Sequence, residues 1–480
     1  MPFNKSVLPE NLAIDQEGIV NVDQHLLTDE QMRRFIANGY LVLKTDFSAE
    51  FHRAMNAHID EVMEREGNPG NNFLPRIPEA QAVFKHPAIR GALTSVLGER
   101  FVTHPHRHCH YTYPGRKVQS WHKDSYWGYR KVRNHHPWWA MIFYYPQPVD
   151  QAMGPSAVLP GTQYYDKRPG DDTEHETFVE GPQGTFILIH YDLWHRGSAN
   201  NSDRTRAMMK FQFVRLDAPE QAAWQNTQAE WQPLNGDGPP TPHEAIWQHQ
   251  WNWQSGRRNV VAPAQDDVAE LPTLLSALQA DYEPDGMDAA YRLAALNGSA
   301  LPALQDALNG ENLNAARRAG YGLTAAGESV TDGLVDALSS ASESARGYAA
   351  FALGERQADV AVPALASLMD DESDWVRFTA AEALGIAGAP QAAVPGLIKA
   401  LNDENDQVRF TSGLSLARIG ADAAEAVPAL VYALNDENRY VRANSAEALR
   451  QIGSPEALDA VLAHLMDTRW CYTTTPDNSF

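Results

Sequence analysis

Two residues in the stretch "SWHKDSYW" (residues 120–127) have side chains suited to metal chemistry. His122 and Asp124 stand two positions apart, so in an extended segment both point to the same face. His195 follows 73 residues after His122. Two neutral imidazoles and one carboxylate form the facial triad that holds Fe(II) in non-haem oxygenases. The three residues therefore fit the protein ligands of an iron centre.

Arg206, 11 residues after His195, fits a second part of this chemistry. A facial triad leaves three octahedral positions open, of which two suit an α-keto acid and one suits dioxygen. An arginine deep in a barrel would hold the far carboxylate of 2-oxoglutarate through a bidentate pair. Arg204 lies next but one on the same strand face, so this geometry alone does not separate the two arginines.

Each of these residues also has a purely structural interpretation. A His-x-Asp pair occurs often by chance, and its side chains can sit hydrogen-bonded on a strand edge. His195 alone fits a buried histidine with its hydrogen bonds made, and Arg206 alone fits a surface ion pair. The joint spacing favours the catalytic interpretation.

The elements that would position these residues are short strands after a helical lead-in. "LLTDEQMRRFIANGYLVLK" predicts a helix and then a strand, with Thr28 and Gln31 at capping-box spacing and Gly39 at the helix end. A second helix is predicted from Ser48 to Gly67. After residue 100 the predicted strands are "FVTHPHRHCHYTY", "PWWAMIFYYP", "PSAVLPG", "GTFILIHY" and "RAMMKFQFVRL". Short strands separated by Gly, Pro and Asp turns predict a jelly roll or barrel.

Four histidines alternate along the first of these strands: His104, His106, His108 and His110. On a regular strand all four would project from one face. No carboxylate is interleaved, and side chains along one face stand too far apart for all four to share one ion. We predict that they form the polar wall of a binding cavity.

The C-terminal half is a repeat. "DESDWVRFTAAEALGIAG", "DENDQVRFTSGLSLARIG" and "DENRYVRANSAEALRQIG" align without gaps, with arginines at positions 377, 409 and 442. Each copy follows a Pro-containing helix, and weaker copies run upstream. A period near 32 residues with two apolar helical segments per copy predicts an α-solenoid. The pattern resembles the short HEAT-repeat families, with about six repeats over residues 271–463.

Local signals refine this solenoid. Asp403 and Asp436 are predicted N-caps of the second helix of a repeat. Gly388, Gly420 and Gly453 are predicted to end these helices. A ladder of arginines can bind a ligand, but we predict that each pairs with acidic loop groups of a neighbouring repeat.

Charge and composition restrict the class of protein. The net charge is −22, of which residues 265–480 carry −19 and the remainder −3, as expected for two domains with different surfaces. A strongly acidic half disfavours nucleic-acid binding. The two cysteines, Cys109 and Cys471, make no disulfide framework and fit a cytoplasmic location. No signal peptide and no membrane-spanning segment is expected.

Residues 27–216 resemble the phytanoyl-CoA dioxygenase family of Fe(II)/2-oxoglutarate enzymes. The pieces that carry the resemblance are "LTDEQMRRFIANGYLVL", "WHKD" (residues 121–124), "MGPSAVLPGTQ" (residues 153–163) and "LWHRGSANNSDRTRAMM". It implies an α+β multidomain protein, with an N-terminal double-stranded β-helix (a cupin-like jelly roll) and flanking helices before the HEAT-like solenoid. The expected domains are residues 1–220 (oxygenase), 221–264 (Trp-rich connector) and 265–480 (solenoid and tail).

The resemblance also assigns roles to individual residues. It implies that His122, Asp124 and His195 bind Fe(II) as the catalytic residues, that Arg206 binds 2-oxoglutarate, and that O2 is the oxidant. Gly197 stands where several relatives have a hydroxyl that contacts the cofactor, so Ser198 is expected to substitute. Gln119 is expected to line the same pocket. Halogenating relatives have a small residue in place of the carboxylate, so the aspartate here favours hydroxylation or desaturation.

Substrate residues are expected in the aromatic segment after the His-x-Asp pair. The candidates are Tyr126, Trp127, Arg130 and Trp138, and the alternative is that these aromatic side chains pack the barrel or the domain junction. A hydrophobic stripe with basic residues suits a flat or anionic small molecule. Five tryptophans are expected to pack the barrel on the solenoid: Trp224, Trp231, Trp247, Trp251 and Trp253.

Two classes of function remain open from the sequence. The first is a hydroxylase of a small-molecule metabolite whose solenoid is an architectural flank or a self-association surface. The second is an oxygenase of a protein-bound or carrier-bound substrate that the solenoid recruits. An acidic concave surface would favour a basic partner and so the second class.

Overall fold

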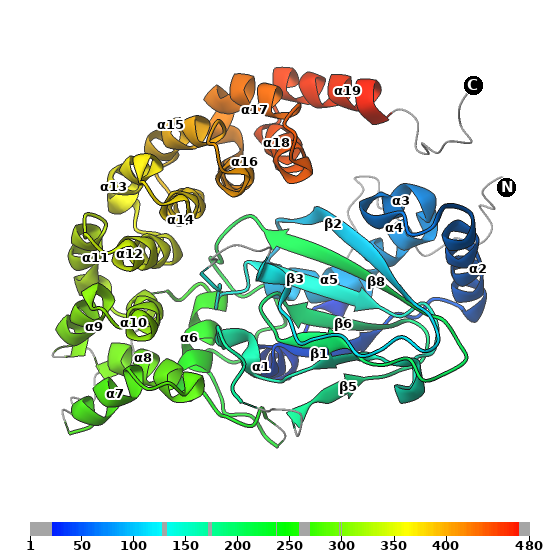
Figure 1. Ribbon diagram of the computed structural model, residues 1–480, viewed down its shortest axis with the longest axis horizontal. Coiled ribbons are helices and arrows are strands. Elements are labelled where there is room, and N and C mark those ends of the chain that lie inside the picture. Colours follow the sequence, from blue (N-terminus) through cyan, green and yellow to red (C-terminus); the bar gives the residue numbers. More distant parts are fainter. Residues whose placement is uncertain are drawn as a thin grey trace.

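A computed structural model describes residues 22–126, 132–170, 175–236, 238–258, 269–296, 298 and 300–469 of the 480-residue chain. Its N-terminal half contains the strands, and its C-terminal half is an arc of paired helices around one side of them (Figure 1). The predicted fold class, a jelly-roll barrel with flanking helices followed by an α-solenoid, is confirmed.

The barrel consists of two antiparallel sheets. The larger has the strand order β1-β6-β3-β8-β2, and the smaller has the order β5-β4-β7. The strands are β1 (Tyr40–Lys44), β2 (Phe101–Thr112), β3 (Trp139–Tyr144), β4 (Ser156–Val158), β5 (Thr177–Val179), β6 (Thr185–His190), β7 (His195–Gly197) and β8 (Arg206–Arg215). Strand β5 was not among the strands predicted from the sequence.

Both faces of the larger sheet are buried. One face carries Met141, Phe143 and Ile187 into the barrel interior. The opposite face is covered by the flanking helices, where Phe84 stacks on Phe211 with ring centroids 3.7 Å apart. These helices are α1 (Asp29–Asn38), α2 (Ala49–Glu66), α3 (Phe73–Arg76), α4 (Pro78–Lys85) and α5 (Pro87–Leu97). The larger sheet therefore forms one wall of the barrel interior, and the flanking helices support it from outside.

The predicted ends of the first two helices are confirmed. Thr28 and Gln31 form a capping box at the start of α1, and Gly39 ends the helix in a left-handed conformation with φ of 78°. Ser48 caps α2 and Gly67 follows its last residue.

The histidine-bearing strand β2 is regular over only part of its length. The register of β2 against β8 is irregular between Thr103 and Arg107, where Pro105 has no N–H to donate to the neighbouring strand. His108 and His110 remain regular, opposite β8. His104 and His106 lie within the irregular stretch, and both contact Tyr440 of the solenoid.

The solenoid consists of six helix pairs and a final helix within the described residues. The inner row is α8 (Glu283–Leu296), α10 (Leu313–Ala325), α12 (Glu343–Glu355), α14 (Asp374–Leu384), α16 (Asp406–Ile419) and α18 (Arg439–Ile452). The outer row is α7 (Leu271–Leu278), α9 (Ala300–Asn309), α11 (Thr331–Ala337), α13 (Val362–Ser367), α15 (Pro390–Ala400), α17 (Val427–Ala433) and α19 (Pro455–Arg469). The inner row faces the barrel (Figure 1).

The predicted arginine pairs are confirmed for three repeats, in which the arginine makes a two-pronged pair with an aspartate of the following repeat: Arg346 with Asp371, Arg377 with Asp403, and Arg409 with Asp436. Arg442 instead donates to the carbonyl oxygens of Asp436 and Glu437 in the loop before its own helix. The repeated arginine is therefore a structural link between repeats.

Two predictions about helix ends in the solenoid are corrected. The N-caps are Asn405 and Asn438, two residues after the predicted aspartates, because those aspartates accept the N–H groups of the two asparagines and the arginine pairs instead. Helix α14 ends at Leu384, so Gly388 lies in the following loop, whereas Gly420 and Gly453 follow their helices directly as predicted.

The tryptophan-rich connector packs the barrel against the solenoid, as predicted. Helix α6 (Glu244–Gln254) contacts α1 of the barrel and α8 of the solenoid. Trp251 packs edge-to-face with Trp224 and Trp231, and Trp253 stacks on His136 with ring centroids 4.1 Å apart. All five tryptophans of the connector are therefore buried.

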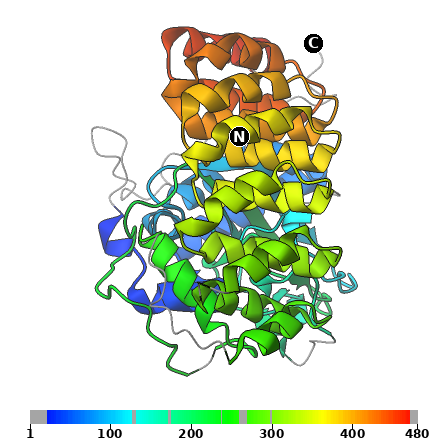
Figure 2. The same ribbon diagram turned by 90° about the vertical axis from the view of Figure 1, so that its left-hand side faces the viewer.

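Polar contacts join the barrel directly to the inner helices. The Tyr321 hydroxyl accepts the N–H of Arg133 at 3.0 Å, and the Tyr291 hydroxyl lies 2.7 Å from His135 Nδ1. Buried His136 pairs with buried Glu355. Seen from its outer side, the solenoid lies across the barrel (Figure 2). The barrel thus occupies the concave face of the solenoid.

Among the described residues, no helix combines the length and apolar character needed to cross a lipid bilayer.

Candidate active site

Backbone pairing brings the three predicted iron ligands together inside the barrel. His122 and His195 exchange N–H to C=O hydrogen bonds of 3.0 Å in an isolated β-bridge, and His195 begins β7. Asp124 begins a short 3₁₀ turn (Asp124–Tyr126) immediately after this bridge. One ligand atom from each residue lies within 4.8 Å of the other two. That spacing allows one ion to contact all three.

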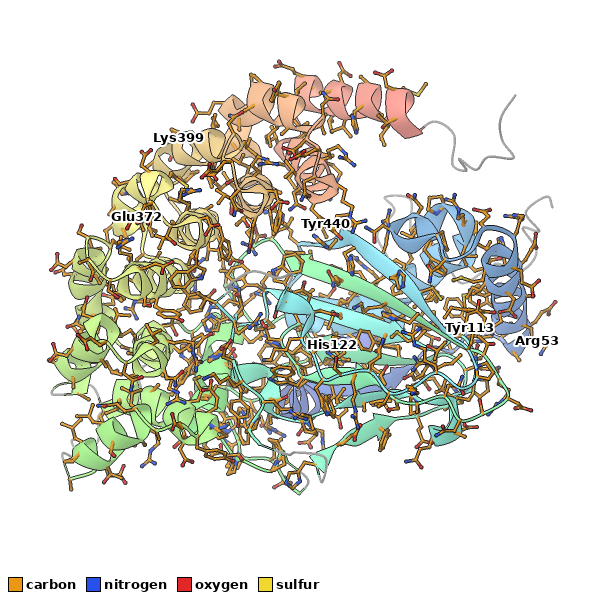
Figure 3. The ribbon with its side chains drawn as sticks, in the orientation of Figure 1. Arg53, Tyr113, His122, Glu372, Lys399 and Tyr440 are labelled. Carbon is orange, nitrogen blue, oxygen red and sulfur yellow. The ribbon has the colours of Figure 1, made fainter. Side chains whose placement is uncertain are left out.

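Both imidazoles are held so that the same nitrogen faces the site. The Nδ1 atoms of His122 and His195 lie 2.9 Å from the carbonyl oxygens of Ser120 and Leu193. A ring nitrogen facing a carbonyl oxygen must donate, so each Nε2 keeps its lone pair for a metal. His122 is near the middle of the side chains in Figure 3.

The electrostatics of the site favour a neutral imidazole and a charged carboxylate, which are the forms that bind metal. Burial lowers the pKa of His195 to about 4. Burial also opposes the charge of Asp124, but Lys210, His195 and His122 outweigh it and hold the pKa of the carboxyl well below its usual range.

Lys210 is a site residue that the sequence analysis missed. Its Nζ donates to Asp124 Oδ2 at 2.7 Å, and both side chains are less than a tenth exposed. Lys210 lies four residues after Arg206 on β8, so both point to the same face of the strand. Because side chains alternate along a strand, the even spacing from Arg206 is the sequence signal that could have identified Lys210 as a site residue.

Arg206 is buried, and some of its guanidinium nitrogens lack hydrogen-bond partners within the described part of the chain. Arg204, in contrast, is exposed and forms an ion pair. Arg206 is 3% exposed, and its Nη2 donates to Thr112 Oγ1 at 3.1 Å. Its Nε and Nη1 have no hydrogen-bond partner among the described residues, and burial lowers its pKa. Arg204 is about half exposed and pairs with the exposed Asp150.

Gln119 and Ser198 lie at the end of β7, the strand that begins with His195. The Gln119 Oε1 accepts the N–H of Gly197 at 3.0 Å, and a Cβ at Gly197 would lie 2.7 Å from it. The glycine therefore makes room for Gln119. The Ser198 hydroxyl is buried without a partner among the described residues. Unpaired buried donors here suit a carboxylate ligand.

The predicted substrate residues divide into three cases. Trp127 and Arg130 lie outside the described residues, and Tyr126 ends the 3₁₀ turn. Trp138 differs from its predicted place. Its buried ring packs edge-to-face with Trp253 and beneath the Arg418 guanidinium, so it belongs to the junction, which was the alternative considered for these aromatics.

A narrow cavity of about 50 Å³ lies between the barrel and the solenoid. Its barrel side is formed by His104, Ser125, Trp139 and Tyr191, and its other side by helices α14, α16 and α18. Ser125 directly follows Asp124. Sequence reasoning did not find this cavity, because its two sides come from distant parts of the chain.

Comparison with known protein families agrees with both halves of this description. Residues 14–208 match the profile of the phytanoyl-CoA dioxygenases, and residues 331–395 and 394–472 match HEAT repeats. The match confirms the resemblance recognised in the sequence and the expected use of Fe(II), 2-oxoglutarate and O2. No curated protein matches the chain.

Several solved structures are similar to the barrel. The non-heme α-ketoglutarate-dependent carbocyclase SnoK from nogalamycin biosynthesis is 19% identical over 46% of this chain and 98% of its own, with a TM-score of 0.34. EctD from S. alaskensis is 15% identical over 46% and 90%, with a TM-score of 0.35. EvdMO1 is 17% identical over 38% of this chain but only 49% of its own, with a TM-score of 0.33. Similarities of this size do not bear on the substrate.

Proposed function

Because residues 14–208 form a phytanoyl-CoA dioxygenase domain, we propose that this 2-oxoglutarate-dependent dioxygenase hydroxylates a small-molecule metabolite. In this proposal His122, Asp124 and His195 hold Fe(II), and Arg206 holds 2-oxoglutarate. The observation that carries it is the approach of three ligand atoms to within 4.8 Å of one another inside a buried barrel.

The chain's own residues have distinct tasks in this reaction. Fe(II) held by His122, Asp124 and His195 would supply the activation of dioxygen that is coupled to conversion of 2-oxoglutarate to succinate and CO2. The carbonyl oxygens of Ser120 and Leu193 orient the two imidazoles. Arg206 offers two unsatisfied nitrogens to the far carboxylate of 2-oxoglutarate, a contact strengthened by burial. Gln119 and Ser198 line that end of the pocket.

The carboxylate of Asp124 favours hydroxylation or desaturation over halogenation. It fills the coordination position that a halide would need. Lys210 supports its charged form, and burial of the pair keeps water away from it. Of these two outcomes we favour hydroxylation, because it requires reaction at one position of the substrate, whereas desaturation requires reaction at two.

A small-molecule substrate is favoured because the barrel covers the inner helices of the solenoid. Contacts such as those of Tyr291, Tyr321 and Glu355 occupy the concave surface on which a recruited protein would dock. A carrier-bound substrate remains the second candidate, and it would have to use the outer row of helices.

The test is oxygen-dependent succinate formation from 2-oxoglutarate, measured with and without Fe(II). Wild type should form succinate only when iron is supplied. Asp124→Gly should lose at least about 99% of this turnover, because the variant lacks one of the three ligands. Asp203→Gly, in an exposed loop, serves as the matched control and should behave as wild type. Full turnover by Asp124→Gly would remove the proposed iron site.

A further inference from the structure

Arg133 bridges the two chain segments that carry the iron-ligand residues. Its Nη1 donates to the Ser125 hydroxyl at 2.7 Å, and Ser125 directly follows Asp124. The Ser125 hydroxyl in turn donates to the carboxylate of Asp192, which stands three residues before His195. Arg133 Nε also lies 3.9 Å from this carboxylate. One guanidinium therefore holds together the turn of Asp124 and the loop that leads to His195.

The bridge lies in a buried place. Ser125 is 1% exposed, Asp192 is 2% exposed and the side chain of Arg133 is 12% exposed. Hydrogen bonds to charged groups are strong where water does not compete for them. Removal of the guanidinium would leave a buried carboxylate without its cation, so the two segments would have to move or admit water.

The solenoid holds the backbone of Arg133. The Tyr321 hydroxyl on α10 accepts the Arg133 N–H at 3.0 Å, across 188 positions of the chain. Tyr321 is 1% exposed, and its ring stacks on His135 with centroids 3.9 Å and planes 12° apart. Helix α10 belongs to the inner row that faces the barrel (Figure 1). Because the tyrosine is fixed by packing, its hydroxyl sets where the Arg133 backbone lies.

A second connection from the solenoid reaches Arg133 through Asp166. Arg133 Nε lies 3.5 Å from Asp166 Oδ1, and the Asp166 N–H donates to Glu283 Oε1 at 3.1 Å. Glu283 begins α8 and pairs with Arg317 and Arg318 of α10 at 2.7 and 2.9 Å. The side chains of this triad are all less than a tenth exposed. The inner helices therefore contact Arg133 directly at its backbone and, through Asp166, at its guanidinium.

Tyr291 offers an internal comparison for Tyr321. Its hydroxyl, on the inner helix α8, lies 2.7 Å from Nδ1 of His135, and the Nε2 of this histidine lies 3.1 Å from the carbonyl oxygen of Tyr164. These side-chain contacts lead from the solenoid to Tyr164, whereas those of Tyr321 lead to Arg133. The two tyrosines thus make similar buried hydrogen bonds to different parts of the barrel.

We infer that Arg133 is a positioning residue of the iron site, and that the solenoid sets its place through Tyr321. The inference rests on the proposed function, because it requires that His122, Asp124 and His195 bind Fe(II). Groups that hold the ligands of a metal in place contribute to its binding, and loss of one typically lowers metal affinity about 10–100-fold. The solenoid is in this respect a part of the iron-binding unit.

The experiment titrates Fe(II) without oxygen into the full metal-free chain at saturating 2-oxoglutarate and follows the visible metal-to-ligand band. Arg133→Gln should weaken the apparent Fe(II) affinity at least about tenfold, because Ser125 and Asp192 lose their shared cation. Arg133→Lys should stay within about threefold of wild type, since an ammonium group also donates to a hydroxyl and pairs with a carboxylate. Arg100→Gln, which breaks an exposed pair with Asp217, is the control and should equal wild type.

Tyr321→Phe tests the link to the solenoid through the loss of one oxygen atom. It should weaken the apparent Fe(II) affinity at least about threefold, whereas Tyr291→Phe should leave it unchanged. Both variants remove one buried hydrogen bond, so the melting temperatures of the two metal-free proteins should fall by similar amounts. A role limited to joining the barrel and the solenoid would affect the Fe(II) affinity of both variants alike.

Four results separate the parts of this inference. Wild-type affinity in Arg133→Gln would overturn the positioning role, and wild-type affinity in Tyr321→Phe would overturn the part of the solenoid in it. Equal weakening by Tyr291→Phe would do the same, and all three results would leave the proposed function intact. Absence of the band from wild type would instead overturn the proposed function. Tyr321→Phe keeps the test decisive if Arg133→Gln does not fold.

Discussion

Arg206 and Arg204 stand two residues apart but differ completely in their surroundings. Arg206 is buried with two nitrogens unpaired, and Arg204 pairs with Asp150 in solvent. Removing one partner of a buried charge pair costs about 3–5 kcal/mol, and an exposed pair is worth about 0–1 kcal/mol. Arg206→Ala should therefore weaken 2-oxoglutarate binding at least about a hundredfold, and Arg204→Ala less than about fivefold.

The measurement is the affinity of both variants for 2-oxoglutarate under the same anaerobic conditions with Fe(II). The reverse order of effects would mean that Arg204 holds the cofactor and that the inward face of β8 has been assigned incorrectly.

Lys210 yields a prediction about metal removal. In the metal-free protein its ammonium group contacts the buried carboxylate of Asp124 directly, at 2.7 Å. Lys210→Met should lower the free energy of unfolding of the metal-free protein by about 3–5 kcal/mol, because it leaves a buried charge without its partner. Anaerobic Fe(II) should restore much of this loss, since a bound cation also compensates the carboxylate.

Thermal unfolding with and without Fe(II) checks this prediction. The metal-induced rise in melting temperature should be larger for Lys210→Met than for wild type, and equal to wild type for the exposed control Lys399→Met. Equal rises in all three proteins would show that Lys210 does not compensate Asp124.

At the residue scale, sequence spacing was enough to identify the three iron-ligand candidates and Arg206. An iron and 2-oxoglutarate site needs only a few residue types, and they occur in a fixed pattern. Lys210 could not be recognised in the same way. Its contact with Asp124 depends on how β8 lies against the turn that begins at Asp124, and that packing is tertiary.

Between elements of the solenoid, the arginine ladder is expected to contribute to stability. Arg377 makes two hydrogen bonds of 2.7 and 3.0 Å to Asp403, with both side chains 10% exposed. Arg377→Ala should lower the free energy of unfolding by about 3 kcal/mol. Lys399→Ala breaks an exposed pair with Asp370 and should change it by at most about 1 kcal/mol.

Urea unfolding followed by helical circular dichroism measures both values. Equal effects of the two substitutions would mean that the ladder does not link the repeats. Lys399, the control position on the outer helix α15, is labelled in Figure 3.

Helix ends could be predicted from the sequence only where the capping residues have no competing partner elsewhere in the chain. Thr28 and Gln31 were predicted correctly, because a capping box needs only its own residues. The cap of α16 was placed at Asp403 instead of Asn405, because both types suit a cap and the competing partner Arg377 comes from another repeat. The irregularity at Pro105 in β2 likewise depends on the neighbouring strand.

For the whole molecule, the enclosure of the barrel by the solenoid was beyond sequence reasoning. The contacts that create it join residues far apart in the chain, such as His135 with Tyr291 and His106 with Tyr440. The period near 32 residues predicted a solenoid, but nothing in it specified what its concave face would cover.

This enclosure predicts the behaviour of a truncated chain. Cutting at Gln265 would expose His135, His136 and the tryptophan layer of α6, so the isolated barrel should aggregate on size-exclusion chromatography. Barrel that is recovered by refolding should still bind 2-oxoglutarate, because Arg206 and the iron-ligand residues all lie before the cut. A monodisperse barrel with an unchanged melting temperature would contradict the account of a shared buried junction.

The central claim is that His122, Asp124 and His195 hold Fe(II) together with 2-oxoglutarate. The most direct measurement is the visible metal-to-ligand absorption band that appears when both are added without oxygen. Wild type and the control His464→Ala, in the outer helix α19, should show the band, and His122→Ala should lose it. A band of full intensity in His122→Ala would contradict the assignment of the iron ligands.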